Sequence, residues 1–264
     1  MNSKKTSLNI DELRKGARAG SKDNQYELSK ILLANSSGKT SSNYIEAIKL
    51  LELAAKDGLV DAQVALADEQ SESEDTYDSA VVWFRRAASE KNPYAIRRLG
   101  ELLYYNSRSE KELMEGLKYL RVSARMGDRD SAYQLGVIYL NPKSDLIMID
   151  EDEAIHYLKM SSNAGKVEAI VALGFIYATG VDGGNTEKDF KLSKDYFDLA
   201  ISKNSIESYH DLAVLHLKEA FRLLDEGVSA ETKHNSVSFN YKIKHSTNLR
   251  KMLKSFGVEY WYDF

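Results

Sequence analysis

Apolar and small residues alternate with polar ones at helical spacing along most of the chain, and the arrangement recurs. The clearest copy lies at 164–180, where Ala169, Leu173, Gly174 and Tyr177 form the pattern A-x-x-x-L-G-x-x-Y. A leucine followed by Gly, Ala or Ser stands in the same register at Leu28-Ser29, Leu66-Ala67, Leu99-Gly100, Leu135-Gly136 and Leu212-Ala213. The second residues of these six pairs, at 29, 67, 100, 136, 174 and 213, are 38, 33, 36, 38 and 39 residues apart. A period of this length predicts a solenoid of repeated helices.

A second set of small residues predicts a trailing helix in each repeat. Pairs such as Ala54-Ala55 and Ser123-Ala124 lie seven residues after another small residue, so both small sites fall on one helix face. A residue suited to the left-handed conformation closes most of these helices, at Gly58, Gly127, Gly165 and Asn204. Lys91 is the departure, and Pro93 follows it. Each repeat is therefore a leading helix, a loop, a trailing helix and a tight turn.

This register predicts one elongated domain over 10–227, preceded by a loose segment at 1–9. A short helix at about 10–19 would cap the first of five helix pairs, and a further leading helix at about 207–226 would bring the count to twelve. The pairs span roughly 23–58, 61–91, 94–127, 130–165 and 168–204. The connection at 141–150 is long and is expected to expose Leu146, Ile147 and Met148.

The repeat pattern stops at 228, and the last segment has a different character. No acidic residue stands between Glu231 and Glu259, whereas six basic residues do, and 243–256 has the spacing of a basic amphipathic helix. The chain then ends in VEYWYDF, which is dense in aromatic residues. We expect 228–264 to cover the apolar end of the solenoid. The alternative is a docking element for an acidic partner or a membrane surface.

Four stretches carry a resemblance to a known family: AIKLLELAAKDG at 47–58, AIRRLGELLYY at 95–105, SAYQLGVIYL at 131–140 and AIVALGFIYATG at 169–180. They resemble the Sel-one-like repeat, a relative of the tetratricopeptide repeat, and the resemblance covers roughly 10–227. It implies an all-α, right-handed α/α superhelical solenoid. The copy at 61–78 departs most, because Gln70 stands where the family has Tyr.

By resemblance to tetratricopeptide stacks, the leading helices line a concave face that binds a partner. The residues three before, one after and four after the second member of each Leu-Gly pair then form one stripe. Tyr and Arg, which are enriched at the centres of interfaces, stand in the middle of this stripe. The alternative for the apolar half is that a tightly curled superhelix buries it. The predicted partner-binding residues are Tyr26, Arg97, Glu101, Tyr104, Tyr133, Val137, Val171, Phe175 and His210.

A row of acidic residues six before the same slot has a simpler explanation than ligand binding. These residues are Asp23, Asp61, Asp130, Glu168 and Glu207, and Tyr94 takes the remaining place. They fall in the first turn of each leading helix, where the helix dipole and the free amide groups favour carboxylates. We therefore expect them to stabilise helix starts.

Composition and spacing disfavour most catalytic and nucleic-acid functions. The chain of 264 residues has no cysteine, which removes disulfides, Cys-based zinc sites and thiol nucleophiles. Its net charge of −4 disfavours general nucleic-acid binding. No two of the five histidines are three or four residues apart, so no helical metal pair is predicted. The GKTS sequence at 38–41 lacks the earlier glycine and the preceding strand of a phosphate-binding loop.

We therefore expect a cytoplasmic, non-catalytic protein that binds another protein and needs no cofactor, metal, nucleic acid or membrane. The start of the chain has no apolar stretch of signal-peptide length. The resemblance allows two roles. One is an immunity protein that neutralises a toxin, and the other is an adaptor or regulator with several partners. A remote alternative is hydrolase activity, which is attributed to some disulfide-rich relatives. A further alternative is nucleic-acid binding through the basic segment 233–254.

Overall fold

The computed structural model describes residues 2–180, 186–203 and 205, with side chains described from Ile10 onward. Within these residues the chain is helical and contains no strand. The helices form two compact units, one ending at Lys166 and the other beginning at Val167. The predicted helix at 207–226, the segment 228–264 and His210 lie outside the described residues.

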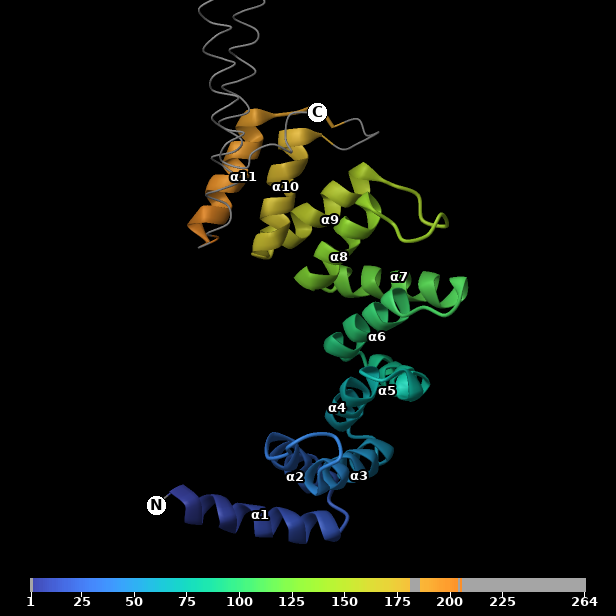
Figure 1. The fold of residues 1–264 in the computed structure, drawn as a ribbon, viewed down its shortest axis with the longest axis vertical. Helices are drawn as coiled ribbons and strands as arrows, with labels where there is room; N and C mark the ends of the chain where they lie inside the picture. The colour runs from blue at the N-terminus through green and yellow to red at the C-terminus, as the bar shows by residue number, and fades with distance from the viewer. Residues whose placement is uncertain (1, 181–185, 204, 206–264) are drawn as a thin grey trace, which may run out of the picture. The chain divides into compact units, whose positions relative to one another are not determined.

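The first unit consists of helices that follow one another in sequence order, as Figure 1 shows. Helix α1 precedes four pairs of a leading and a trailing helix. A short 3₁₀ turn, Glu74–Thr76, precedes α5. The helices are α1 (Asn2–Arg18), α2 (Lys22–Ala34), α3 (Ser42–Lys56), α4 (Val60–Ser71), α5 (Tyr77–Ser89), α6 (Pro93–Tyr105), α7 (Glu110–Arg125), α8 (Arg129–Leu140) and α9 (Glu151–Asn163).

The second unit is described as one helix pair, α10 (Val167–Thr179) and α11 (Phe190–Ser202). The hydroxyl of Ser193 donates to the backbone oxygen of Gly174 at 2.8 Å, and the ring of Phe197 lies beside the same glycine. A side chain at 174 would meet that ring. The pair therefore uses the small-residue packing that the sequence predicted.

Helix α1 begins much earlier than the sequence predicted. The expected helix covered about 10–19 and followed a loose segment, whereas the structure extends it back to Asn2. Residues 2–15 contain neither proline nor glycine, so nothing in the chain stops the helix from continuing toward the N-terminus. Its Ile10 and Leu13 pack against a buried cluster formed by Ala17, Leu28, Leu32 and Ala47.

The ends of the helices follow local chemistry. A Ser, Asn or Asp side chain accepts the backbone N–H three residues later and starts α2, α3, α6, α7, α8, α9 and α11. The predicted glycine turns after α3, α7 and α9 have φ values of 81°, 93° and 84°. Lys91 takes the same left-handed conformation with φ 60°, so its repeat keeps the turn without a glycine.

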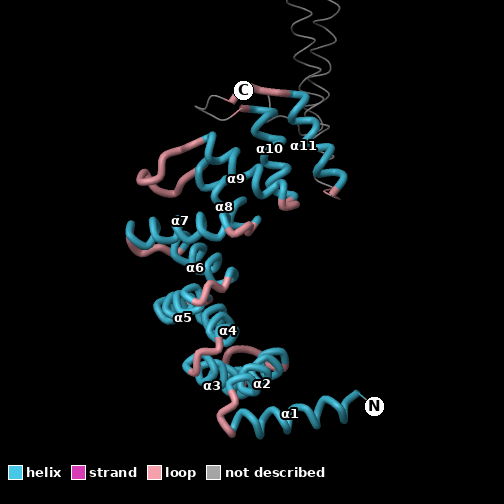
Figure 2. The backbone as a smooth tube through the Cα atoms, turned by 180° about the vertical axis from the view of Figure 1, so that it is seen from behind, coloured by secondary structure: helices cyan, strands magenta, loops and turns pink. Residues whose placement is uncertain are grey.

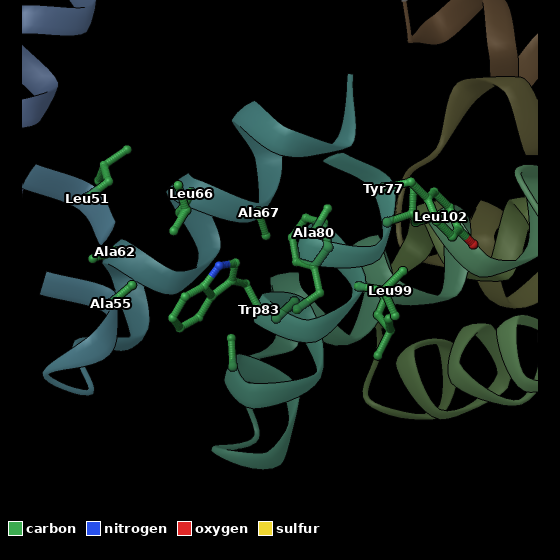
Figure 3. Close-up of a cluster of buried hydrophobic side chains, with 14 of the residues drawn as sticks. Leu51, Ala55, Ala62, Leu66, Ala67, Tyr77, Ala80, Trp83, Leu99 and Leu102 are labelled. Atoms are coloured by element: carbon green, nitrogen blue, oxygen red, sulfur yellow. The ribbon is translucent and has the colours of Figure 1, made fainter. Parts of the chain in front are cut away.

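The core follows the predicted repeat register. Leu66, Leu99, Leu135 and Leu173 are fully buried, and Leu28 is 2% exposed. Figure 3 shows one cluster in which Trp83 of α5 lies among residues of α3, α4 and α6. Gly116 of α7 lies directly on the backbone of α6, where a Cβ would come within 2.9 Å of the Gly100 oxygen. The small residues thus allow close helix contact, as the sequence predicted.

The connection at 141–150 projects from the α8–α9 pair (Figure 2). Leu146 and Met148 are exposed, as expected. The expectation was wrong for Ile147, which is only 5% exposed and packs with Leu117, Tyr139 and Tyr157. The backbone N–H of Asp150 donates to the Tyr139 oxygen at 3.0 Å and ties the end of the loop to α8. The loop is therefore anchored by one inward side chain.

Candidate protein-binding surface

We call the surface formed by α2, α4, α6 and α8 of the first unit the leading-helix face. The predicted residues Tyr26, Arg97, Glu101, Tyr133 and Val137 belong to these helices. Val137 is 40% exposed, and Tyr26, Arg97, Glu101 and Tyr133 are partly buried. Val171 and Phe175 lie on α10 in the second unit, and the structure does not place them relative to the others.

A chain of ion pairs crosses the leading-helix face and joins three repeats. The guanidinium of Arg98 donates to Asp68 at 3.0 Å and to Glu101 at 2.9 Å. Arg97 donates to the other oxygen of Glu101 at 2.9 Å and lies 3.6 Å from Asp128. The side-chain amide of Gln134 also donates a hydrogen bond to the Glu101 carboxylate, at 2.8 Å. We call these six residues the leading-helix network.

The network determines the charge state of its central carboxylate. The Glu101 side chain is 11% exposed. Burial alone would raise the pKa of the Glu101 carboxyl, but hydrogen bonds from Arg98, Gln134 and Arg97 outweigh burial and hold that pKa below its usual value. The pKa of Arg98 is raised because the bonds to Glu101 and Asp68 outweigh burial. Arg97 and Glu101 are therefore bound to residues of their own chain, and their role in partner binding stays a prediction.

Aromatic side chains beside the network remain accessible. Tyr94 is 42% exposed, and the guanidinium of Arg97 lies 5.0 Å from its ring centre. Tyr105 is 51% exposed at the end of α6. The ammonium of Lys166 lies 5.7 Å from the ring centre of Tyr133 and 2.9 Å from Asp130. Together with Val137, the tyrosines Tyr94, Tyr105 and Tyr133 form what we call the aromatic surface.

The sequence analysis missed Tyr94 and Tyr105. Tyr94 was visible as the one residue in the row of first-turn acids that is not acidic. The acids themselves lie in first helical turns, as predicted for Asp23, Asp61, Asp130 and Glu168. Asp130 has an additional role, because it pairs with Lys166 from the turn after the next trailing helix.

The prediction that Tyr104 binds a partner was wrong. Its side chain is 2% exposed and lies in the cluster that contains Leu113, Leu117 and Leu120 of α7. In this repeat Leu103 occupies the inward position that holds Tyr139 and Tyr177 in the next two copies, and Tyr104 also turns inward. The neighbouring Tyr105 is the one that reaches the surface.

In the second unit Phe175 is 37% exposed, and its ring meets the ring of Phe197 edge-on, with centres 5.3 Å apart. Val171 is partly buried. An apolar side chain that is accessible on α10 is consistent with the predicted stripe. The role of Val171 and Phe175 in binding stays a prediction, and His210 lies outside the described residues.

Two further kinds of site are absent from the described part of the chain. Across residues 2–180, 186–203 and 205, no group of three His, Cys, Asp or Glu side chains could hold a metal ion. No described helix has both the length and the apolar composition needed to cross a bilayer.

Solved structures with a similar fold confirm the repeat architecture. The chain aligns over 96% of its length with c5321, a protective antigen of uropathogenic Escherichia coli, with a TM-score of 0.62 and 19% identity, and covers 50% of that chain. It aligns over 75% of its length with a Sel1 repeat protein from Oxalobacter formigenes, with a TM-score of 0.60 and 20% identity, and covers 57% of that chain. At these identities the likeness concerns the fold alone.

A curated relative and a family model complete the comparison. The chain is 29% identical over 202 residues to the chitin synthase regulator SKT5 of Saccharomyces cerevisiae, an alignment that takes 72% of this chain but only 28% of the relative. The model of the Sel1 repeat matches five consecutive segments, 25–59, 60–92, 93–128, 129–166 and 167–205, which agree closely with the predicted helix pairs. The chain therefore belongs to the Sel1 repeat family.

Proposed function

We propose that this chain is a non-catalytic scaffold that binds a partner protein through the aromatic surface of its leading helices. The observation that carries the proposal is the position of Tyr94, Tyr105 and Tyr133 beside an ion-pair network that is already complete. The network holds the backbone of α6 and α8 in place, so the accessible rings are presented by a rigid surface. Tyrosine contributes a large contact area with few rotatable bonds, which suits it to interface centres.

Membership of a repeat family supports the same conclusion, since Sel1 repeats generally act as scaffolds for other proteins. Two finer roles remain as proposals. A regulatory adaptor is favoured by the relative named as a regulator of chitin synthase, although the chain spans about a quarter of that protein. A toxin-neutralising immunity role is the second candidate, and it rests on the family resemblance alone. We further propose that the protein acts in the cytoplasm.

The test is capture of partners from native lysate with the full chain and with a Tyr105→Ala, Tyr133→Ala double variant. Tyr105 is 51% exposed and Tyr133 is partly exposed and outside the buried core, so these changes remove contact area without opening the core. A Leu53→Ala, Val82→Ala variant is the matched control, because it removes two exposed apolar side chains from trailing helices. We expect the partner to be lost with the tyrosine variant and retained with the control.

The captured proteins also separate the two roles. One stoichiometric partner with toxic activity would support the immunity role, whereas several weaker partners would support an adaptor. A partner that binds the tyrosine variant as well as the wild type would contradict the proposed surface. Arg97 is a poor choice for this test because its substitution would break the leading-helix network.

A further inference from the structure

The trailing helices of the first unit carry a repeated ion pair. Arg14 of α1 lies 3.9 Å from Glu46 of α3, and Arg85 of α5 lies 2.8 Å from Glu115 of α7. Arg14 stands two residues before Gly16-Ala17, and Arg85 stands two residues before Ala87-Ala88. The glutamate stands directly before a small residue of the next trailing helix. The spacing therefore places an arginine and a glutamate opposite each other between α1 and α3 and between α5 and α7, whereas Glu52 and Ser79 hold these positions on α3 and α5.

The same positions on α7 and α9 hold Arg121 and Glu153, but the ion pair is absent there. Arg121 instead directs its Nε and an Nη nitrogen to the hydroxyl of Tyr139, with the Nε at 3.0 Å. Within the described residues, the Glu153 side chain has no ion-pair partner, and neither has Arg125, one turn after Arg121. This is the place where the inserted loop 141–150 sends Ile147 into the core.

A pocket of about 390 Å³ lies where the pair is missing. Its floor is formed by buried residues, among them Leu117, Ile147 and the parallel rings of Tyr139 and Tyr157, whose centres are 5.9 Å apart. Its apolar rim is formed by three side chains that are largely exposed, Met114, Leu146 and Met148. This volume falls within the range of ligand pockets, about 300–1,000 Å³.

The charged groups of the pocket are not equivalent. Arg121 and Arg125 line one side, and Asp150 and Glu153 line another. The carboxylate of Asp150 is engaged, because it accepts the backbone N–H of Glu153 at the start of α9. Arg125 is exposed and unengaged within the described residues, and Arg121 keeps N–H donors beyond those that reach Tyr139. The Glu153 carboxylate has no ion-pair partner among the described residues, so the pocket offers the free donors of Arg121 and Arg125 on its α7 side and one free carboxylate at the start of α9.

We propose that this pocket is a second docking site, distinct from the aromatic surface, for a protein segment that carries an apolar side chain next to a carboxylate. The apolar side chain enters between Met114, Leu146 and Met148. The carboxylate pairs with Arg125 and with the remaining N–H groups of Arg121. Flexible methionines at the rim suit a site that accepts apolar side chains of different shapes. The segment belongs to another protein, so the chain would hold two proteins at once.

The test is a display library of short random peptides, selected on the full-length wild-type chain and counter-selected on an Arg125→Glu, Met148→Ser variant. Arg125 and Met148 are both exposed, so this variant keeps the core intact, which circular dichroism checks. We expect the enriched peptides to place Asp or Glu within two positions of Leu, Ile, Met or Phe. A synthetic fluorescent copy should bind about tenfold more weakly to Arg125→Glu and more weakly at high salt.

Lys118→Glu is the matched control, because it makes the same charge change on α7 at an exposed residue that does not line the pocket. Binding of the peptide should be unchanged in this control and in the tyrosine variant of the leading-helix face. The proposal is overturned if no peptide is enriched, if the enriched peptides bind the counter-selection variant equally, or if they are basic. Binding of dodecanoate without any selected peptide would make the pocket a lipid site and overturn it too.

Discussion

At the scale of single residues, the close contact between α7 and α6 depends on Gly116. Its backbone lies against α6, and an added Cβ would meet backbone atoms of Gly100, Leu103 and Tyr104. Backbone atoms within a packed helix cannot move aside as the end of a side chain can. The sequence showed that this position is always small, and the structure explains why it is a glycine in this repeat.

The Gly116→Ala variant tests this constraint. An alanine in the middle of a helix normally stabilises it by about 1 kcal/mol relative to glycine. Overpacking of a tight contact costs about 1–3 kcal/mol, and here the crowded atoms are backbone. We therefore expect the free energy of unfolding to fall by about 1 kcal/mol or more, measured by chemical denaturation. Ser123→Ala on the same helix is the control. Its buried hydroxyl has no hydrogen-bond partner among the described residues, so the free energy of unfolding should stay equal or rise.

The leading-helix network makes a prediction about pH. Replacing Glu101 by Gln keeps the shape but removes the charge that Arg97 and Arg98 bind. We expect the free energy of unfolding at neutral pH to fall by about 2 kcal/mol. The pKa of Glu101 is lower in the folded state. The wild-type contribution is therefore complete above the unfolded pKa of about 4.3 and is lost as the pH falls through the folded pKa.

Denaturation curves of wild type and E101Q between neutral and acid pH measure this effect. The variant should lose less stability than the wild type on acidification, and parallel pH profiles for the two proteins would contradict the assignment. Glu27→Gln is the control, because Glu27 pairs with Lys30 at 2.9 Å with both side chains about half exposed. Such a surface pair contributes little, so its removal should leave the stability nearly unchanged.

Residue patterns predicted inward positions well and surface roles less well. In the described repeats the leucine of each leading helix and the small residue after it are buried, whereas Ala88 and Ser162 in the trailing helices are partly exposed. Tyr104 was misassigned because it lies at the boundary between the inward and the outward face of α6. At such a boundary the sequence does not show which of two neighbouring residues points inward. The ion-pair partners of Arg97 and Arg98 are Asp68 on α4, Glu101 on α6 and Asp128 at the N-cap of α8. A helical-wheel plot of a single helix cannot show ion pairs between helices. A comparison of charged residues about one repeat apart would have suggested these pairs.

At the scale of elements, the loop 141–150 depends on a single inward side chain. Ile147 is 5% exposed, while Met148 beside it is 82% exposed. Alternating inward and outward side chains in a short loop cannot be read from three consecutive apolar residues, which explains why the sequence predicted all of them outside. The presence of this loop also distinguishes the α7–α9 region from the other repeats.

Ile147→Ala should therefore loosen the loop. We expect a loss of about 2 kcal/mol in the free energy of unfolding, the lower part of the range for Ile→Ala in a core, and faster proteolytic cleavage within 141–150. Met148→Ala should change neither quantity, because its side chain buries little area. Equal cleavage rates in the two variants would mean that Ile147 does not hold the loop.

At the scale of the whole molecule, the buried residues of the first unit form separate clusters rather than one core. One cluster runs from Leu51 to Leu103 and another from Tyr104 to Tyr157, so the two meet at consecutive residues of α6. A period of 33 to 39 residues predicted this arrangement in outline, because each repeat buries its apolar face mainly against its neighbours. The positions of the cluster boundaries required the structure, since adjacent residues of one helix belong to different clusters.

This division into clusters predicts which helices a destabilising core substitution affects. Leu66 is fully buried in the first of these clusters, and Leu66→Ala would leave a cavity that costs about 2–5 kcal/mol. In a solenoid the loss acts first on the repeat that carries it and on its direct neighbours. Hydrogen exchange should therefore become faster in α3, α4, α5 and α6, and much less so in α8 and α9. Leu135→Ala, in the other cluster, should give the reverse distribution. If both variants instead accelerate exchange equally throughout α2 to α9, the two clusters unfold as one cooperative unit despite their separate packing.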